Sequence, residues 1–149
     1  MSVLAHISRS KFIGGASITG GSIFINGLSN VYFSGSIFTD NSAKYSGGAI
    51  HAQNYMLVSL ENSFFEDNYA THKGSEFYGL YGNITKFTNV KISRPSNSTS
   101  IFLDTCSLIT NNLQISDSND FASYAGGISC FNCLSISISK SSFKNLFGK

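Results

Sequence analysis

Acidic residues are the first candidates for chemistry in this chain, because carboxylates can act as general acids and bases or bind cations. The chain holds eight Asp and Glu residues. Asp40, Asp67 and Asp117 each follow a large apolar residue by two positions, and Arg94 has the same place in the segment between Asp67 and Asp117. The shared spacing makes these four residues one set.

Three roles are open to this set. The favoured role is structural, because Asp is common at tight turns, where its side chain bonds to nearby backbone. Asp40, Asp67 and Asp117 are also weak candidates for a metal site. If Asp40 and Asp67 lie on neighbouring strands, they would be about 5 Å apart, the carboxylate separation of retaining glycosidases. Any two acids in such positions share that distance, so it does not by itself predict catalysis.

Other signatures of catalysis or cofactor binding are missing from the sequence. His6, His51 and His72 are isolated from one another and show no metal-ligand spacing. No serine lies in a G-x-S-x-G elbow, and no Lys-Ser or Lys-Thr pair follows the Gly-Gly pairs. We therefore predict a protein with no catalytic residue, no cofactor and no resident metal.

The chain has three cysteines, Cys106, Cys130 and Cys133. The pair Cys130 and Cys133 has the spacing of a redox motif or of half a zinc site, but no second C-x-x-C accompanies it. Cys106 and Cys130 fall near the same place in successive repeats of the chain, so they form a candidate disulfide. Buried free thiols are the main alternative, and a metal or redox role is a further one.

Two asparagines are candidate glycosylation sites. Asn83 begins the triplet Asn-Ile-Thr, and Asn97 begins the triplet Asn-Ser-Thr. Both triplets are acceptors only if the chain enters a eukaryotic secretory pathway. With 27 Ser and 14 Asn in the chain, such triplets also arise by chance.

The residues described so far recur because the chain repeats with a period of 27 residues, and residues 20–46 align with residues 47–73 without a gap. Matched positions include Gly20/Gly47, Gly21/Gly48, Val31/Val58, Phe38/Phe65, Asp40/Asp67 and Asn41/Asn68. A weaker copy follows from Gly74, a shortened one from Ile101 and another from Gly126. Repeats of this length indicate a solenoid.

Within each repeat, apolar and small polar residues alternate, which is the periodicity of β-strands. Three short strands in each repeat, broken by Gly, Asn and Asp, predict an all-β parallel β-helix of about five coils of roughly 27 residues. Equivalent residues should then form ladders through the core. The two predicted ladders are Phe12–Phe38–Phe65–Ile92–Ile115–Phe143 and Val31–Val58–Thr85–Leu108–Ile136.

The residues between strands are expected to serve the turns. We predict that Asn41 and Asn68 adopt tight-turn backbone conformations and stack their amides from coil to coil. The pairs Gly20-Gly21 and Gly47-Gly48 should supply backbone freedom where the next strand begins.

The segment FTDNSAKYSGGAI at 38–50 carries a resemblance, through F-x-x-N followed by G-G-A-I. It resembles the paired repeat of chlamydial polymorphic outer-membrane proteins and of related protist and bacterial surface proteins with a pectin-lyase-like β-helix. The resemblance implies a right-handed coil, an extracellular or cell-surface location, and an adhesive or structural role. Residues 65–77 keep the first half of the motif but have Gly74-Ser75-Glu76-Phe77 in the second. The repeat therefore indicates fold more strongly than activity.

Composition narrows the classes of partner. The net charge is only +2 and the basic residues are scattered singly, so we expect no nucleic-acid binding. No apolar run approaches the roughly 20 residues of a membrane span. Neither end has the polar cap that protects the open edges of a solenoid. We therefore expect residues 1–149 to be one β-helix segment whose ends meet other protein chains or a continuation of the same solenoid.

Three functions are compatible with this sequence. The first is a non-catalytic structural or adhesive module of a cell-surface or secreted protein, with glycans as further partners. The second is a β-helix that binds or cleaves polysaccharides, and the third is a structural subunit of a large intracellular assembly. The hallmark motifs of polygalacturonases, such as Asn-Thr-Asp and Gly-His-Gly, do not occur, which disfavours the cleaving enzyme.

Overall fold

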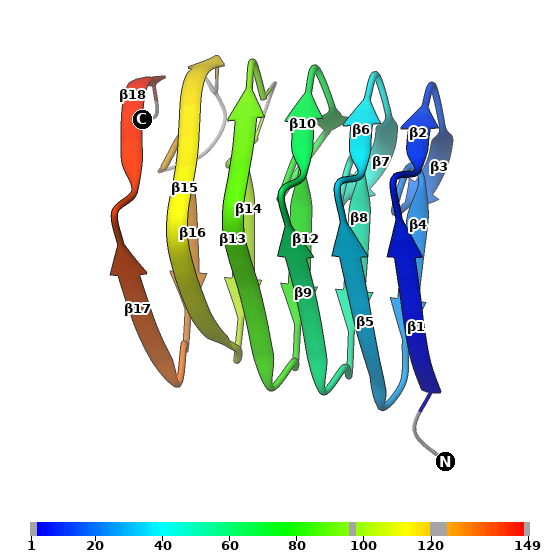
Figure 1. The fold of residues 1–149 in the computed structure, drawn as a ribbon. Helices are drawn as coiled ribbons and strands as arrows, with labels where there is room; N and C mark the ends of the chain where they lie inside the picture. Colours follow the sequence, from blue (N-terminus) through cyan, green and yellow to red (C-terminus); the bar gives the residue numbers. More distant parts are fainter. Residues whose placement is uncertain (1–2, 96–97, 120–124, 148–149) are drawn as a thin grey trace.

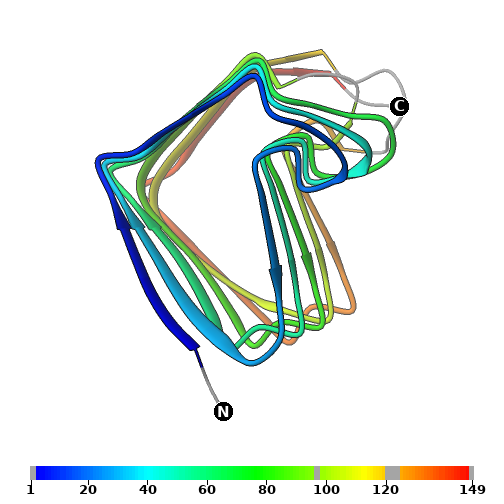
Figure 2. The same cartoon turned by 90° about the vertical axis from the view of Figure 1, so that its right-hand side faces the viewer.

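A computed structural model describes residues 3–95, 98–119 and 125–147. The described chain winds into a parallel β-solenoid of about five coils, as predicted (Figure 1). Figure 2 looks along the stack and shows the coils lying over one another around a common interior. Each coil contributes one strand to each of three faces, and parallel pairing joins the successive coils.

The three faces share one strand order along the stack. The first face holds β1 (Val3–Ser8), β5 (Ser29–Ser34), β9 (Leu57–Glu61), the first parts of β13 (Ile84–Ser93) and β15 (Ser107–Asn119), and β17 (Ser135–Ser139). The second face holds β2 (Lys11–Ile13), β6 (Ile37–Thr39), β10 (Phe64–Glu66), the later parts of β13 and β15, and β18 (Ser142–Phe147). The third face holds β4 (Ile23–Asn26), β8 (Ile50–Gln53), β12 (Phe77–Leu80), β14 (Ile101–Asp104) and β16 (Ile128–Phe131).

Both predicted ladders are confirmed at every step. Strand register pairs Phe12 with Phe38, Phe38 with Phe65, and so on to Phe143. The second ladder likewise runs unbroken from Val31 to Ile136. Because side chains at these positions point inward in every coil, the core is a set of parallel columns.

The coils turn at residues in the left-handed backbone region, which form columns of their own. One column, here called the Asp67 corner, joins the second face to the segment that follows it. Its members are Gly14, Asp40, Asp67, Arg94, Asp117 and Asn145, with φ between 48° and 68°. Two further columns are Arg9, Gly35, Asn62, Asn89, Asn112 and Lys140, and Gly27, Asn54, Tyr81, Thr105 and Asn132. Since Gly, Asn and Asp tolerate positive φ best, the corners explain why these residues are abundant.

A lobe projects from the first three coils between the second and third faces (Figure 2). It consists of residues 14–22, 41–49 and 68–76. Its strands are β3 (Ala16–Thr19), β7 (Ser42–Ser46) and β11 (Tyr69–Ala70).

The two glycines of the Gly47-Gly48 pair have different roles in this lobe. Gly47 has φ +66°, which only glycine adopts easily, and turns the chain out of the lobe. Gly48 lies where two backbone segments meet, so a Cβ there would collide with the backbone oxygens of Ser75 and Tyr69. The expectation that the pair supplies backbone freedom is therefore right for Gly47, whereas Gly48 supplies space.

Asn41 and Asn68 close the neck of the lobe. The Asn41 Nδ2 donates to the Oδ1 of Asn68 at 2.8 Å and to the carbonyl oxygen of Phe12 at 3.0 Å. Asn68 Nδ2 donates in turn to the carbonyl oxygen of Phe38 at 2.9 Å. The predicted stack of amides is confirmed, but the prediction of a tight-turn backbone at the asparagines is wrong, because the preceding residues of the Asp67 corner take the positive φ.

Candidate functional site

Asp40, Asp67 and Asp117, the three acids with shared spacing, all lie on the Asp67 corner, with φ of 54°, 53° and 59°. The structure thus gives them the predicted turn role. A carboxylate is well suited to such a position because a short polar side chain can hydrogen-bond locally when the backbone is left-handed.

Arg94 lies beside Asp67 in the next coil and binds its carboxylate through two hydrogen bonds. Arg94 Nε donates to Asp67 Oδ1 at 2.9 Å and Nη2 donates to Oδ2 at 2.6 Å. Nη2 also lies 3.0 Å from Glu66 Oε1. The two hydrogen bonds and the positive charge of Arg94 lower the pKa of Asp67. Asp67 is therefore a charged partner of Arg94 and is not poised as a general acid.

Asp117 has a neutral partner in the following coil. Asn145 Nδ2 donates to Asp117 Oδ1 at 2.9 Å. This hydrogen bond, followed by one from Ser116, lowers the pKa of Asp117. The corner therefore alternates carboxylates with donors, and Arg94 occupies the place between Asp67 and Asp117 where a shared cation would need to sit. Among the described residues, no cluster of three or more His, Cys, Asp or Glu side chains could hold a metal ion.

Replacing Arg94 with alanine should raise the pKa of Asp67 towards the ordinary range, because both hydrogen bonds disappear. Side-chain carbon NMR during an acid titration measures this pKa. We expect almost no change in the midpoint of thermal unfolding, since an exposed ion pair contributes little to stability. Lys86→Ala is the control and should leave Asp67 titrating as in the unchanged protein. A pKa of Asp67 that does not respond to Arg94→Ala would rule out the pair in solution.

A hollow of about 620 Å³ lies along the C-terminal half of the Asp67 corner. Its lining includes Asp67, Arg94, Pro95, Asp117, Ser118, Asn145 and Phe147. Planar polar groups thus face the same space as an exposed phenyl ring and a proline ring. Such a mixture can bind a small polar molecule that has one apolar side.

Glu76 is a buried carboxyl group that the sequence analysis did not single out. It occupies the inward position that Ala49 has in the preceding coil, and it is fully buried. Asn68 Nδ2 donates to Glu76 Oε2, whereas Oε1 has no hydrogen-bond partner. Burial raises the pKa of Glu76 to about 8, so the group is protonated at neutral pH. The available signal was a charged residue at an apolar repeat position.

His51 belongs to a row of rings on the outside of the third face. Register places it between Phe24 and Tyr78, with ring centroids 5.1 and 4.7 Å away. Ser46 Oγ lies 3.0 Å from His51 Nδ1, and burial lowers the pKa of His51. Because the rings stack on one another from coil to coil, their faces are already in contact, and the row serves to join the coils.

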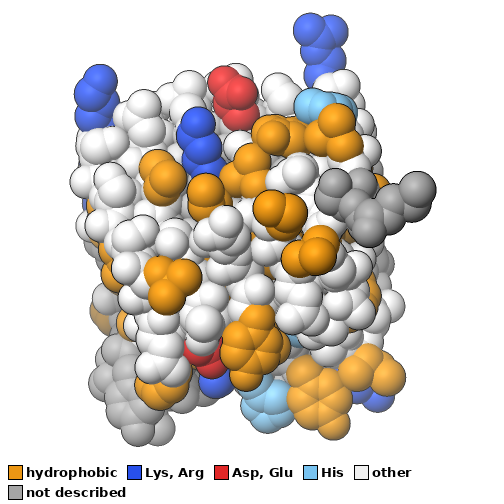
Figure 3. Space-filling view, turned by 90° about the horizontal axis from the view of Figure 1, so that it is seen from below, with side chains coloured by type: hydrophobic (Ala, Val, Ile, Leu, Met, Phe, Trp, Pro, Cys, Tyr) orange, Lys and Arg blue, Asp and Glu red, His pale blue; other side chains and the backbone are white. Residues whose placement is uncertain are grey.

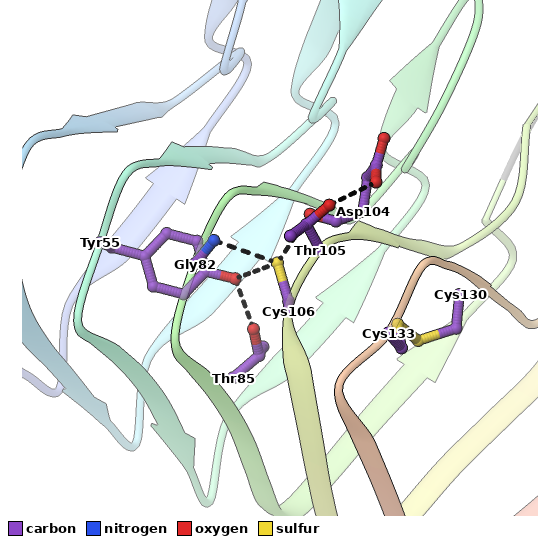
Figure 4. Close-up of a disulfide and its surroundings, with 8 residues drawn as sticks. All are labelled: Tyr55, Gly82, Thr85, Asp104, Thr105, Cys106, Cys130 and Cys133. Carbon is purple, nitrogen blue, oxygen red and sulfur yellow. Dashed lines mark hydrogen bonds between the residues drawn. A yellow bond between two sulfur atoms is a disulfide. The ribbon is translucent and has the colours of Figure 1, made fainter.

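The cysteines are paired differently from the prediction (Figure 4). Cys130 forms a disulfide with Cys133, and Cys106 is a buried free thiol. The predicted disulfide between Cys106 and Cys130 is wrong, because Cys130 lies in register with Leu103, three residues before Cys106. The shared column was misjudged because the fourth repeat is shortened.

Cys106 lies in a small polar site inside the core (Figure 4). Its sulfur accepts hydrogen bonds from the backbone N–H of Gly82 at 3.3 Å and from Tyr55 Oη at 3.4 Å. Tyr55 Oη also lies 2.5 Å from Thr85 Oγ1. Burial raises the pKa of Tyr55 above its ordinary value. A phenol, a thiol and a hydroxyl thus satisfy one another where an apolar core would leave Tyr55 without a partner.

Asn83, one of the two candidate glycosylation sites, lies exposed at the turn between β12 and β13. Asn97 lies outside the described residues. No helix of the described chain is long and apolar enough to cross a membrane.

Comparisons with protein families, with curated proteins and with solved structures find no match to this chain.

Proposed function

We propose that this protein is a non-catalytic structural or adhesive module of a cell-surface or secreted protein. The observation that carries the proposal is the use of the acids at the Asp67 corner. Asp67 is neutralised by Arg94, and Asp117 is bonded to Asn145, so neither is free to work with a second carboxylate. The regular stack of coils then acts as a scaffold that presents side chains at fixed spacing.

The disulfide supports a location outside the cell, because disulfides persist in oxidising compartments. The resemblance to the repeats of polymorphic outer-membrane proteins points the same way. In support of that likeness, each part of F-x-x-N and G-G-A-I has a specific task at the neck of the lobe. We infer a pectin-lyase-like, right-handed coil on the same grounds.

An adhesive role is supported by the lower edge of the solenoid. Large exposed side chains occur there on successive turns, namely Leu28, Met56, Tyr81 and Leu134. Figure 3 views this edge and shows hydrophobic side chains spread over it, with few charged ones among them. A surface of this kind suits binding through shape and apolar contact.

The C-terminal coil supports a further contact with protein. Ile136, Ile138 and Phe143 point along the inward ladders, yet they are 55%, 48% and 40% exposed. They are exposed because no described coil covers them. We propose that another chain, or a further coil of the same solenoid, packs on this end.

Mass spectrometry of the protein isolated from its source tests the surface role. We expect the peptide with Cys130 and Cys133 to gain two hydrogen atoms on reduction, and the peptide with Asn83 to lose mass on deglycosylation. Bare Asn83 together with three free thiols would overturn the proposal. That result would favour the structural subunit of an intracellular assembly.

Polysaccharide binding is the second candidate function, and the hollow along the Asp67 corner favours it. Asp117, Asn145 and Arg94 can exchange hydrogen bonds with hydroxyl groups, and the ring of Phe147 can contact the apolar side of a sugar.

Asp117→Ala should weaken binding to a panel of soluble polysaccharides at least tenfold if the hollow binds sugar. Asp40→Ala, at the same corner but outside the hollow, is the control and should bind like the unchanged protein. Absence of binding, or equal binding by both variants, would reject this site. Release of oligosaccharides by the unchanged protein would instead reveal a cleaving enzyme.

A further inference from the structure

Three cysteines from two neighbouring coils lie close to one another near the C-terminal end of the core (Figure 4). Thr105 and Asn132 are the left-handed corner residues of these coils, with φ of 55° and 49°. Cys106 directly follows the first of them and Cys133 directly follows the second. Cys106 and Cys133 therefore hold equivalent positions in successive coils.

Backbone pairing supports this equivalence. Leu134 N donates to the carbonyl oxygen of Cys106 at 3.0 Å, so the residue after Cys133 is bonded to Cys106 itself. Neighbouring strands lie about 4.8 Å apart, and disulfides form when the two Cα atoms are about 4.4 to 6.8 Å apart. Cys106 lies in the core and Cys133 packs against it, so both side chains point to the same interior. The distance and the direction both suit a bond between Cys106 and Cys133.

We propose that Cys106, Cys130 and Cys133 form a site of internal thiol–disulfide exchange. The thiolate of Cys106 attacks Cys133 Sγ, so that the bond between Cys106 and Cys133 forms as the bond between Cys130 and Cys133 breaks. Cys130 leaves as a thiolate and takes up the proton that Cys106 lost. One disulfide is exchanged for another, so the step needs neither an oxidant nor a reductant.

The exchange changes what the disulfide holds together. The bond between Cys130 and Cys133 closes a turn within one coil, with a sequence separation of three residues. A bond from Cys106 to Cys133 would span 27 residues and fasten the fifth coil to the fourth. The fifth coil is the one whose ladder residues are exposed, so the new bond would stabilise the end on which a partner is proposed to pack. A longer closed loop also removes more entropy from the unfolded chain.

Two single substitutions test the site in the purified protein, independently of the proposed surface role. Cys130→Ser leaves Cys106 and Cys133, which are in register. Cys133→Ser leaves Cys106 and Cys130, which are three residues out of register. After mild oxidation with oxidised glutathione and alkylation of the remaining thiols, peptide mapping shows which cysteines are joined.

We expect Cys130→Ser to yield mainly the peptide pair joined through Cys106 and Cys133, and Cys133→Ser to keep both thiols open to alkylation. The joined Cys130→Ser protein should also unfold at a temperature several degrees above its reduced form. Free thiols in Cys130→Ser, or equal joining in both variants, would overturn the proposal.

The unchanged protein provides a test that does not depend on how the variants fold. It is held at pH 8, quenched with acid and alkylated, and its peptides are mapped. Alkylation of Cys130 in a fraction of the molecules supports the exchange. Alkylation confined to Cys106 after prolonged incubation would contradict it.

Discussion

Replacing Phe38 with alanine should lower the free energy of unfolding by about 3–5 kcal/mol, the usual loss for a large aromatic residue in a core. Phe38 is fully buried. Its ring stacks between Phe12 and Phe65 at centroid distances of 4.8 and 4.6 Å and meets Phe33 edge-on at 5.6 Å. The truncation leaves a cavity between three coils, which a stack fixed by backbone pairing on both sides cannot close.

Urea unfolding followed by circular dichroism measures this loss, and the ladder supplies a matched control. Phe143 belongs to the same ladder but lies in the last coil and is 40% exposed. Phe143→Ala should therefore cost less than half as much as Phe38→Ala. Equal losses for the two variants would show that the position within the stack does not decide burial, which contradicts the described core.

The second large effect is a dependence of stability on pH that comes from Glu76. The pKa of this carboxyl is about 8 in the folded protein and 4.5 without burial. Between these values the folded state keeps a proton that the unfolded state has lost. The free energy of unfolding should therefore fall as the pH rises from 4.5 to 8, by about 1.4 kcal/mol per pH unit, and level off above 8.

Glu76→Gln should remove this slope, because glutamine keeps the shape of the protonated carboxyl and does not ionise. Urea unfolding at several pH values between 5 and 8 compares the variant with the unchanged protein. Glu61→Gln, at an exposed carboxyl, is the control and should keep the slope. If the slope persists in Glu76→Gln, another group is responsible and the burial of Glu76 is not as described.

The ladders could be predicted from sequence because two simple regularities define them. The period of 27 residues sets the distance along the chain, and alternation within a strand decides which residues face inward. Phe12, Phe38 and Phe65 satisfy both, so their contact follows without knowledge of the turns. The turn role of the acids could be predicted as well, because Asp is one of the few residues that tolerate a left-handed corner.

The neck of the lobe could not be predicted, since it depends on contacts within one coil. Glu76 lies at an inward position, but only the path of the lobe brings Asn68 to it. The disulfide failed for a related reason. The shortened fourth repeat shifts Cys106 relative to a count of residues, and strand pairing is needed to see that Cys133 is its neighbour.

Nuclear Overhauser spectroscopy with labelled phenylalanine rings tests the central claim, the stack of coils, most directly. The account predicts cross-peaks between Phe12 and Phe38 and between Phe38 and Phe65, whose ring centroids are 4.8 and 4.6 Å apart. It predicts none between Phe12 and Phe65, which lie on opposite sides of Phe38. A spectrum without the cross-peak between Phe38 and Phe65 would contradict the parallel β-solenoid described for this protein.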